Sequence, residues 1–166
     1  MKYGFLMAAA LMLSPFAASA QTASTTASVT VENYALDITK NLDLSFGSIT
    51  PSASADGTMT LAPNGLVSTT GGVTSRSGSG YSPAAYTISG VPAASFSVTV
   101  APTTVTLSGP GGTLTVGDFA LNQATPITLD SSSGLAFFNV GATLFVNAGQ
   151  LPGKYTGTFD VTVAYN

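Results

Sequence analysis

The chain has 166 residues, enough for one domain, and only 7% of them are charged, 4 basic and 7 acidic, against roughly 25% in an ordinary soluble domain. It contains no His, Cys or Trp, which excludes Ser–His and Cys–His nucleophiles, structural zinc sites and disulfides. The net charge is -3, and the few cations exclude a nucleic-acid surface, because phosphate neutralisation needs clustered Lys and Arg. Hydrophobic residues make up 45% of the chain, so a core can form.

Residues 1–20 have the pattern of a secretory signal peptide. Lys2 is followed by an apolar run from Phe5 to Leu13 and then by Ala18-Ser19-Ala20. A charged start, an apolar centre and a small-x-small ending are typical of such signals, and the apolar run is too short for a membrane anchor. We expect cleavage before Gln21 and export of a product that is soluble or is assembled outside the membrane.

The segment 21–31 follows, with the sequence QTASTTASVTV. One face carries Ala23, Thr25, Ala27, Val29 and Val31. These residues have odd numbers, whereas the next apolar residues along the chain have even numbers. The alternation therefore changes phase at Glu32-Asn33, and one straight strand cannot bury the apolar residues on both sides of that point. Either a β-bulge lies there, or residues 21–31 are a separate extended element suited to strand addition. The pattern alone favours the bulge, because bulges are common.

The rest of the chain alternates apolar and polar residues with a period of two, which predicts strands and no helix. Asn64-Gly65, between Met59–Leu61 and Leu66–Ser68, predicts a two-residue hairpin turn. The Gly- and Ser-rich stretch 71–83 is expected to be a loop. Other expected strands carry Leu42, Leu44 and Phe46; Tyr86 and Ile88; Phe96, Val98 and Val100; Val105 and Leu107; Leu114 and Val116; Ile127 and Leu129. Short strands at this spacing indicate an antiparallel β-sandwich.

Two later segments have the most regular alternation. From Leu135 to Val146, one face carries Phe138, Val140, Ala142, Leu144 and Val146. The last expected strand places Tyr155, Gly157, Phe159, Val161, Val163 and Tyr165 on one face. An apolar strand of this kind is an aggregation hazard at a sheet edge. Either it is central, or one of its neighbours is provided by another chain.

The chain resembles the pilin subunits of the chaperone–usher pathway. The resemblance lies in Leu44-Ser45-Phe46-Gly47-Ser48-Ile49, in Val140–Leu144 and in the ending from Pro152 to Asn166, with Gly153 fourteenth from the end and Tyr165 penultimate. It is greatest for the archaic and alternative branches, which include spore coat protein U-like domains, and for cysteine-free pilin-like domains of unknown function. The resemblance covers roughly residues 21–166. The chain differs from many pilins in one respect, because it lacks the disulfide that they carry.

The resemblance implies an immunoglobulin-like sandwich over residues 32–166 that lacks its last strand. A groove would then lie beside the C-terminal strand, whose expected pairing residues are Gly153, Tyr155, Gly157, Phe159, Val161, Val163, Tyr165 and Asn166. A periplasmic chaperone would first occupy this groove and bind the terminal carboxylate of Asn166. At the outer-membrane usher, the donor strand 21–31 of the next identical or related subunit would replace it, with Ala27, Val29 and Val31 in the pockets and Ala23 and Thr25 as weaker candidates.

The function implied is that of a pilus or fimbria subunit, serving attachment or biofilm formation, without catalysis, cofactor, metal or small-molecule substrate. The alternative is a self-contained secreted β-sandwich, such as a carbohydrate-binding module, although most aromatic residues occupy alternating positions typical of a core. An enzyme is disfavoured, because the candidate acids occur singly and not in metal-loop spacing; they are Asp37, Asp43, Asp56, Asp118, Asp130 and Asp160.

Overall fold

A computed structural model describes residues 22–30, 34–76, 78 and 80–166. The chain divides into two units, residues 1–32 and 33–166. Within the first unit, residues 22–30 are exposed and have no regular secondary structure. The expected signal peptide, its cleavage site and the phase change at Glu32-Asn33 lie outside the described residues.

The described part of the chain contains twelve strands and no helix, as the period-two pattern predicts. It therefore contains no helix that could cross a membrane. The strands are β1 (Asp37–Leu42), β2 (Ile49–Thr50), β3 (Gly57–Leu61), β4 (Val67–Thr69), β5 (Thr74–Ser75), β6 (Ala84–Ser89), β7 (Ser95–Ala101), β8 (Val105–Gly109), β9 (Gly112–Leu121), β10 (Ile127–Thr128), β11 (Leu135–Val146) and β12 (Asp160–Tyr165).

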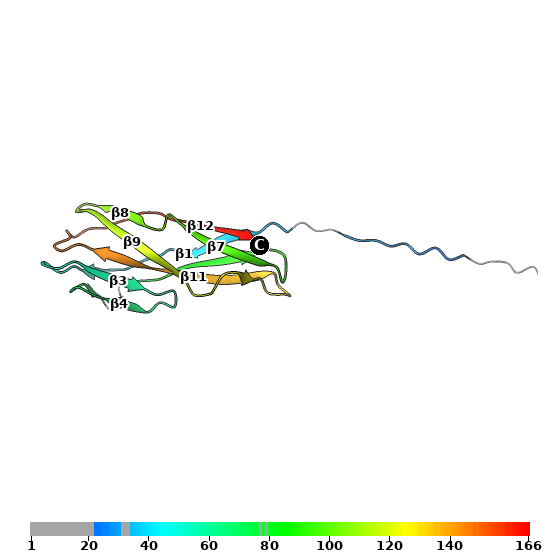
Figure 1. The fold of residues 1–166 in the computed structure, drawn as a ribbon, viewed down its shortest axis with the longest axis horizontal. Coiled ribbons are helices and arrows are strands. Elements are labelled where there is room, and N and C mark those ends of the chain that lie inside the picture. Colours follow the sequence, from blue (N-terminus) through cyan, green and yellow to red (C-terminus); the bar gives the residue numbers. More distant parts are fainter. Residues whose placement is uncertain (1–21, 31–33, 77, 79) are drawn as a thin grey trace, which may run out of the picture. The chain divides into compact units, whose positions relative to one another are not determined.

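All the pairs are antiparallel, and the strands form an immunoglobulin-like β-sandwich (Figure 1). The largest sheet has the order β1-β6-β11-β3-β4, and β9 also pairs with β11 and carries β8. A second sheet has the order β10-β7-β12, and β2 pairs with β5 alone. A single bridge between Ser108 and Thr156 links the end of β8 to the segment before β12.

The expected core face of β11 is confirmed. Phe138, Val140, Ala142, Leu144 and Val146 are all buried. They divide between two clusters of buried side chains, which meet along this strand. The first cluster joins β11 to β6, β7 and β10, and the second joins β11 to β3, β8 and β9. The second cluster is the one that borders the site described below.

The hairpin at Asn64-Gly65 is also confirmed, with a slightly longer loop than expected. β3 and β4 pair as far as Leu61 and Val67, and the Ala62 amide donates to the Leu66 carbonyl at 2.8 Å. Gly65 has a φ of 85°, a left-handed conformation that glycine adopts without steric cost. The Leu66 amide donates to the side-chain oxygen of Asn64 at 3.1 Å, so the asparagine side chain stabilises the turn.

Two segments differ from the sequence expectation. The stretch 71–83 includes the short strand β5, which pairs with β2. The last strand was expected from Tyr155 but begins at Asp160, and β12 lies at the edge of its sheet. In the described chain, residues 155–159 make a single β-bridge to β8 on one side and pair with no strand on the other. They therefore do not form a continuous ladder of backbone hydrogen bonds.

Tyr165 fastens the end of β12 to two other parts of the second unit. Its hydroxyl accepts a hydrogen bond from the Val91 amide at 2.7 Å and lies 3.5 Å from the Tyr34 carbonyl oxygen. Gly90 leaves room for this hydroxyl, because a Cβ at that position would lie 2.3 Å from it. The penultimate tyrosine therefore holds the turn after β6 against the beginning of the domain.

Removal of the Tyr165 hydroxyl tests how much it contributes to the stability of the folded domain. Tyr165→Phe leaves the Val91 amide without its acceptor, so we expect the free energy of unfolding to fall by about 1 kcal/mol. Urea denaturation measures this as a lower midpoint with an unchanged slope. Tyr81→Phe serves as a control, and an equal loss in both variants would show that the Val91 bond contributes nothing specific.

Candidate functional site

A groove of about 800 Å³ lies between two stretches of chain that are far apart in sequence. One wall is residues 43–51 and the other is residues 150–157 together with Phe159. The floor consists of six apolar side chains of the second core cluster and its margin: Val105, Leu107, Leu114, Val116, Leu144 and Val146. The groove thus lies directly over part of the hydrophobic core of the sandwich, and of its floor residues Leu107 alone is half-buried while the others are buried.

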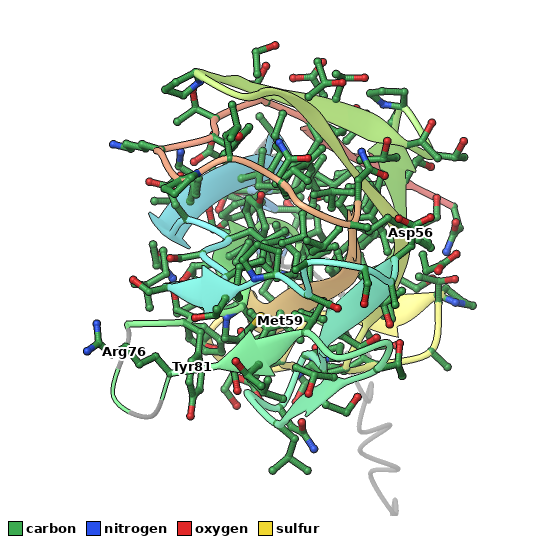
Figure 2. The ribbon with its side chains drawn as sticks, turned by 90° about the vertical axis from the view of Figure 1, so that its left-hand side faces the viewer. Asp56, Met59, Arg76 and Tyr81 are labelled. Atoms are coloured by element: carbon green, nitrogen blue, oxygen red, sulfur yellow. The ribbon has the colours of Figure 1, made fainter. Side chains whose placement is uncertain are left out.

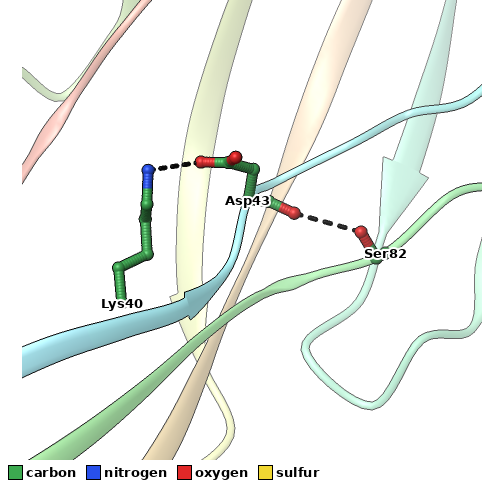
Figure 3. Close-up of polar contacts among 3 residues, drawn as sticks. All are labelled: Lys40, Asp43 and Ser82. Atoms are coloured by element: carbon green, nitrogen blue, oxygen red, sulfur yellow. Dashed lines mark hydrogen bonds and ion pairs between the residues drawn. The ribbon is translucent and has the colours of Figure 1, made fainter.

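The first wall is fixed from behind by Ser82. The backbone groups of Ser45 and Ser82 exchange two hydrogen bonds of 2.8 Å, and the Ser82 hydroxyl donates to the Asp43 carbonyl at 3.0 Å (Figure 3). Backbone groups of successive residues in an extended chain point to opposite edges. Those of Leu44 and Phe46 consequently point toward the groove, where no described backbone group pairs with them.

The second wall has the same arrangement. Thr156 exchanges backbone hydrogen bonds of 2.9 and 3.0 Å with Ser108, so the backbone groups of Tyr155 and Gly157 point the other way, toward the groove. Within the described chain these groups also have no backbone partner. Two extended segments with unpaired amides and carbonyls therefore border an apolar floor.

Glycine at two positions permits the second wall to lie close to β8 and β9. A Cβ on Gly157 would lie 2.7 Å from the Thr106 carbonyl oxygen and 2.8 Å from Leu107 Cδ2. A Cβ on Gly153 would lie 2.8 Å from Pro110 Cδ. All three distances are shorter than a carbon atom tolerates, so a larger residue would push this wall away from the hairpin between β8 and β9 and change the width of the groove.

Three hydrogen bonds close the groove at its 150–155 end. The Gln150 side-chain amide donates to the Gly111 carbonyl at 3.1 Å and to the Tyr155 hydroxyl at 2.7 Å. The Tyr155 hydroxyl donates to the Leu151 carbonyl at 2.8 Å. The Tyr155 ring lies against Gly109, where a Cβ would be 2.5 Å from Cδ1. These contacts hold the loop after β11 on the tip of the β8–β9 hairpin.

The groove carries little charge. Asp43 lies at one end and forms a 2.5 Å ion pair with Lys40, which is not in the groove (Figure 3). Hydrogen bonding to this carboxylate raises the pKa of Lys40. Lys154 lies at the other end, is exposed, and has no ion pair with a described residue. Arg76 is outside the groove and points away from the domain (Figure 2).

The structure brings together part of the expected pairing strand. Gly153, Tyr155, Gly157 and Phe159 line the groove. Val161 and Val163 instead pack against the first core cluster, Tyr165 binds Val91, and the Asn166 amide donates to the Ser95 carbonyl at 3.2 Å. Among the expected donor residues, Ala23, Thr25, Ala27 and Val29 are exposed and outside any strand, and Val31 lies outside the described residues.

The opposite wall and the floor were not assigned a role from the sequence. Leu44 and Phe46 were expected to be strand residues, but no ladder includes them, because Ser45 alone makes a bridge. Their alternation is the signal that could have indicated a second pairing edge. Val105 and Leu107 were expected only as core, and nothing in their pattern distinguishes a groove floor from a closed interior.

The acidic side chains do not form a second site in the part of the chain described. No three residues of metal-binding type gather there. Asp130 accepts hydrogen bonds from the Ser133 amide at 2.8 Å and the Ser132 amide at 3.0 Å. These amides and the Ser133 hydroxyl lower the pKa of Asp130, and the bonds are those of a local turn.

Residues 36–165 match the model of a family described as a domain of unknown function, DUF4402. The chain belongs to this family. Its DUF4402 region begins just before β1 and ends at the last residue of β12, so it includes both walls of the groove and leaves out residues 21–31. No curated protein and no solved structure matches the chain.

Proposed function

We propose that this protein is the structural subunit of an extracellular fibre, in which each copy accepts a strand from the next. The observation that carries the proposal is the groove, whose two walls present unpaired backbone groups across an apolar floor. A single extended segment can pair with both edges and cover the floor, which is how strand addition gives affinity and specificity. Identical grooves and identical donors make a head-to-tail contact that continues as a filament.

The segment 21–31 has the chemistry of such a donor. It contains no charged residue and no Pro or Gly, and one face carries only small or β-branched side chains. Residues 22–30 are exposed, and Val29 is 85% accessible. An exposed valine in an extended segment gains burial on entering an apolar groove, by about 1.5–3 kcal/mol for a full side chain.

In this proposal the subunit is exported, received by a periplasmic chaperone and assembled by an outer-membrane usher. The chaperone would cover the groove before assembly, because an open apolar edge invites aggregation. The fibre would serve attachment or biofilm formation. The subunit itself performs no catalysis and needs no cofactor.

The proposal predicts that Val29→Asp abolishes fibres. An unpaired carboxylate in an apolar groove costs several kcal/mol, whereas Ser28→Asp places the same charge on the opposite face of the segment. Material from cells producing each variant is examined by negative-stain electron microscopy, with secretion measured in parallel. We expect fibres from the parent chain and from the Ser28 variant and none from the Val29 variant. A parent chain that is a stable monomer contradicts the proposal and favours a self-contained sandwich.

A further inference from the structure

We infer that the outer face of the large sheet, around Phe137, is a binding site for neutral sugars whose hydroxyl groups are equatorial, as in a β-linked glucan. The site is separate from the groove and does not depend on strand donation. β11 turns Leu144 and Val146 inward, to the groove floor. Phe137 lies on the opposite face of the same strand, because side chains alternate along a strand. A segment bound in the groove therefore leaves Phe137 uncovered.

Phe137 is the most exposed aromatic side chain among the described residues. Its exposed fraction is 60%, and no described aromatic ring stacks on it. Single apolar side chains are common on protein surfaces and need no partner. The polar groups around the ring consequently decide what it can bind.

Two carboxamide side chains border the Phe137 ring across the strands. On the β6 side, Asn41 Nδ2 donates to the Thr87 hydroxyl at 2.7 Å, and Thr87 is directly opposite Phe137. At the other edge of β11, Gln123 Nε2 donates to the Phe137 carbonyl at 2.5 Å. Both amides are thus oriented through their NH₂ groups. No donor among the described residues bonds to Asn41 Oδ1 or Gln123 Oε1, so both oxygens are free acceptors.

Asn139 extends this arrangement along β11. It is two residues from Phe137 and so on the same face of the strand, and its Nδ2 donates to the Pro63 carbonyl at 3.2 Å. Asn139 Oδ1 accepts no hydrogen bond from a described residue. Beside it, Asn122 Oδ1 accepts from the Asn139 backbone amide at 2.8 Å, which leaves Asn122 Nδ2 able to donate. Three fixed acceptors and one donor therefore surround the exposed ring.

A sugar ring with equatorial hydroxyl groups matches this arrangement. Its axial C–H bonds form an apolar face with partial positive charge, which packs on the negative face of an aromatic ring. Its hydroxyl groups extend from the rim of the ring, where they can donate to amide oxygens. Directly opposite residues in a sheet have Cβ atoms about 4.5–5.5 Å apart, so the polar groups near Thr87 lie within reach of the rim of a sugar stacked on Phe137. A few fixed polar groups around an apolar surface are typical of small-molecule sites.

Charge favours a neutral sugar over an acidic one. None of the polar side chains that surround Phe137 is charged. Lys40, the cation of β1, forms its ion pair with Asp43. Asp37 lies one row away from Phe137 in the register of the sheet, and its negative charge would repel an acidic sugar. The ligand class is therefore an uncharged polysaccharide.

Phe145 provides a comparison within the same strand. It lies on the same outer face and is 39% exposed. Its cross-strand neighbours are Thr58 and Thr115, and the Thr58 hydroxyl is bonded to the Thr70 hydroxyl at 2.7 Å. No described carboxamide is hydrogen-bonded to Phe145, Thr58 or Thr115. Phe145 thus has an exposed ring without the fixed amide oxygens, and it is the matched control for Phe137.

Titration calorimetry of the secreted chain with cellohexaose, a β-linked glucose oligomer, tests this inference. We expect saturable binding by the parent chain and an affinity about tenfold lower or less in Phe137→Ala, as for loss of a central aromatic contact. Phe137→Trp should strengthen binding a few-fold, because a larger ring covers more of the sugar. Phe145→Ala should leave the affinity unchanged. Urea denaturation of each variant checks that it is folded.

Two further comparisons test the amides and the class of sugar. Gln123→Met and Asn41→Leu each remove one acceptor at similar side-chain size, so each should weaken cellohexaose binding several-fold. Mannohexaose has an axial hydroxyl group on each sugar, and an oligomer of galacturonic acid carries negative charge. Both should bind the parent chain several-fold more weakly than cellohexaose does.

The inference is wrong if the parent chain does not bind cellohexaose, if Phe137→Ala and Phe145→Ala weaken binding equally, or if both amide variants bind as the parent does. Equal affinity for cellohexaose and either of the other two sugars contradicts the ligand class. A parent chain that binds no sugar, and whose fibres lose side-by-side association on Phe137→Ala, would show that a second copy covers this face instead. Strand donation is tested separately by Val29→Asp, so none of these results decides the proposed function.

Discussion

A domain that begins at Glu32 is expected to be stabilised by a synthetic peptide of residues 21–31. Without the peptide, Leu44, Phe46 and Leu107 in the groove stay half-buried, and the midpoint of thermal unfolding should be low. A ligand that binds only the folded state adds about 2.7 kcal/mol at a hundredfold excess over its Kd. For a domain of this size we expect a rise of roughly 10 °C, measured by circular dichroism during heating.

A peptide carrying Val29→Asp is the control, since it keeps the length and backbone hydrogen-bonding capacity of the parent. It should raise the midpoint much less at the same concentration, because its carboxylate must lose water to enter the groove. A truncated domain that melts at a high temperature and ignores both peptides would show that the sandwich is already complete.

The second large effect is expected in the core at β11. Phe138 is 1% exposed and stacks on Tyr86 with ring centroids 5.3 Å apart. Phe138→Ala removes this contact and leaves a cavity, so the free energy of unfolding should fall by about 3–5 kcal/mol. The measurement is urea denaturation of fibre-free material, with the peptide present at the same concentration for each variant.

The neighbouring residue provides the matched control. Phe137 lies on the other face of the same strand and is 60% exposed, so Phe137→Ala should change the free energy of unfolding by about 0.5 kcal/mol or less. Equal losses in the two variants would contradict the assignment of faces on β11. The comparison therefore tests the alternation on which the strand register depends.

Alternation was sufficient to predict the sandwich, because each strand buries one face and exposes the other. The buried face of β11 and the hairpin at Asn64-Gly65 follow directly from it. The groove could be predicted in part, as an open edge beside Tyr155 and Gly157. Its second wall at Leu44 and Phe46 depends on the bridge between Ser45 and Ser82, a contact between distant residues that no local pattern encodes.

Some aromatic residues also depart from a simple core assignment. Tyr86, Phe96 and Phe138 are buried, whereas Phe137 is largely exposed although it occupies an alternating position in the same strand as Phe138. β11 has phenylalanine on both faces, but the apolar alternation continues from Phe138 through Val140 to Val146, which indicates that Phe138 is the buried one. The pairing of β11 with β6 and the packing of both on β7 confirm this.

The bond between Tyr165 and the first residues of the domain has a mechanical consequence. A pull on Tyr34 along the direction of β1 loads the five residue pairs of β1 and β6 together, in shear, because β1 lies immediately after the point of attachment. The Tyr165 hydroxyl, which lies close to both the Tyr34 carbonyl and the Val91 amide, shares this load with β12. Tension on the chain is thus distributed over both sheets and does not peel one edge strand away residue by residue.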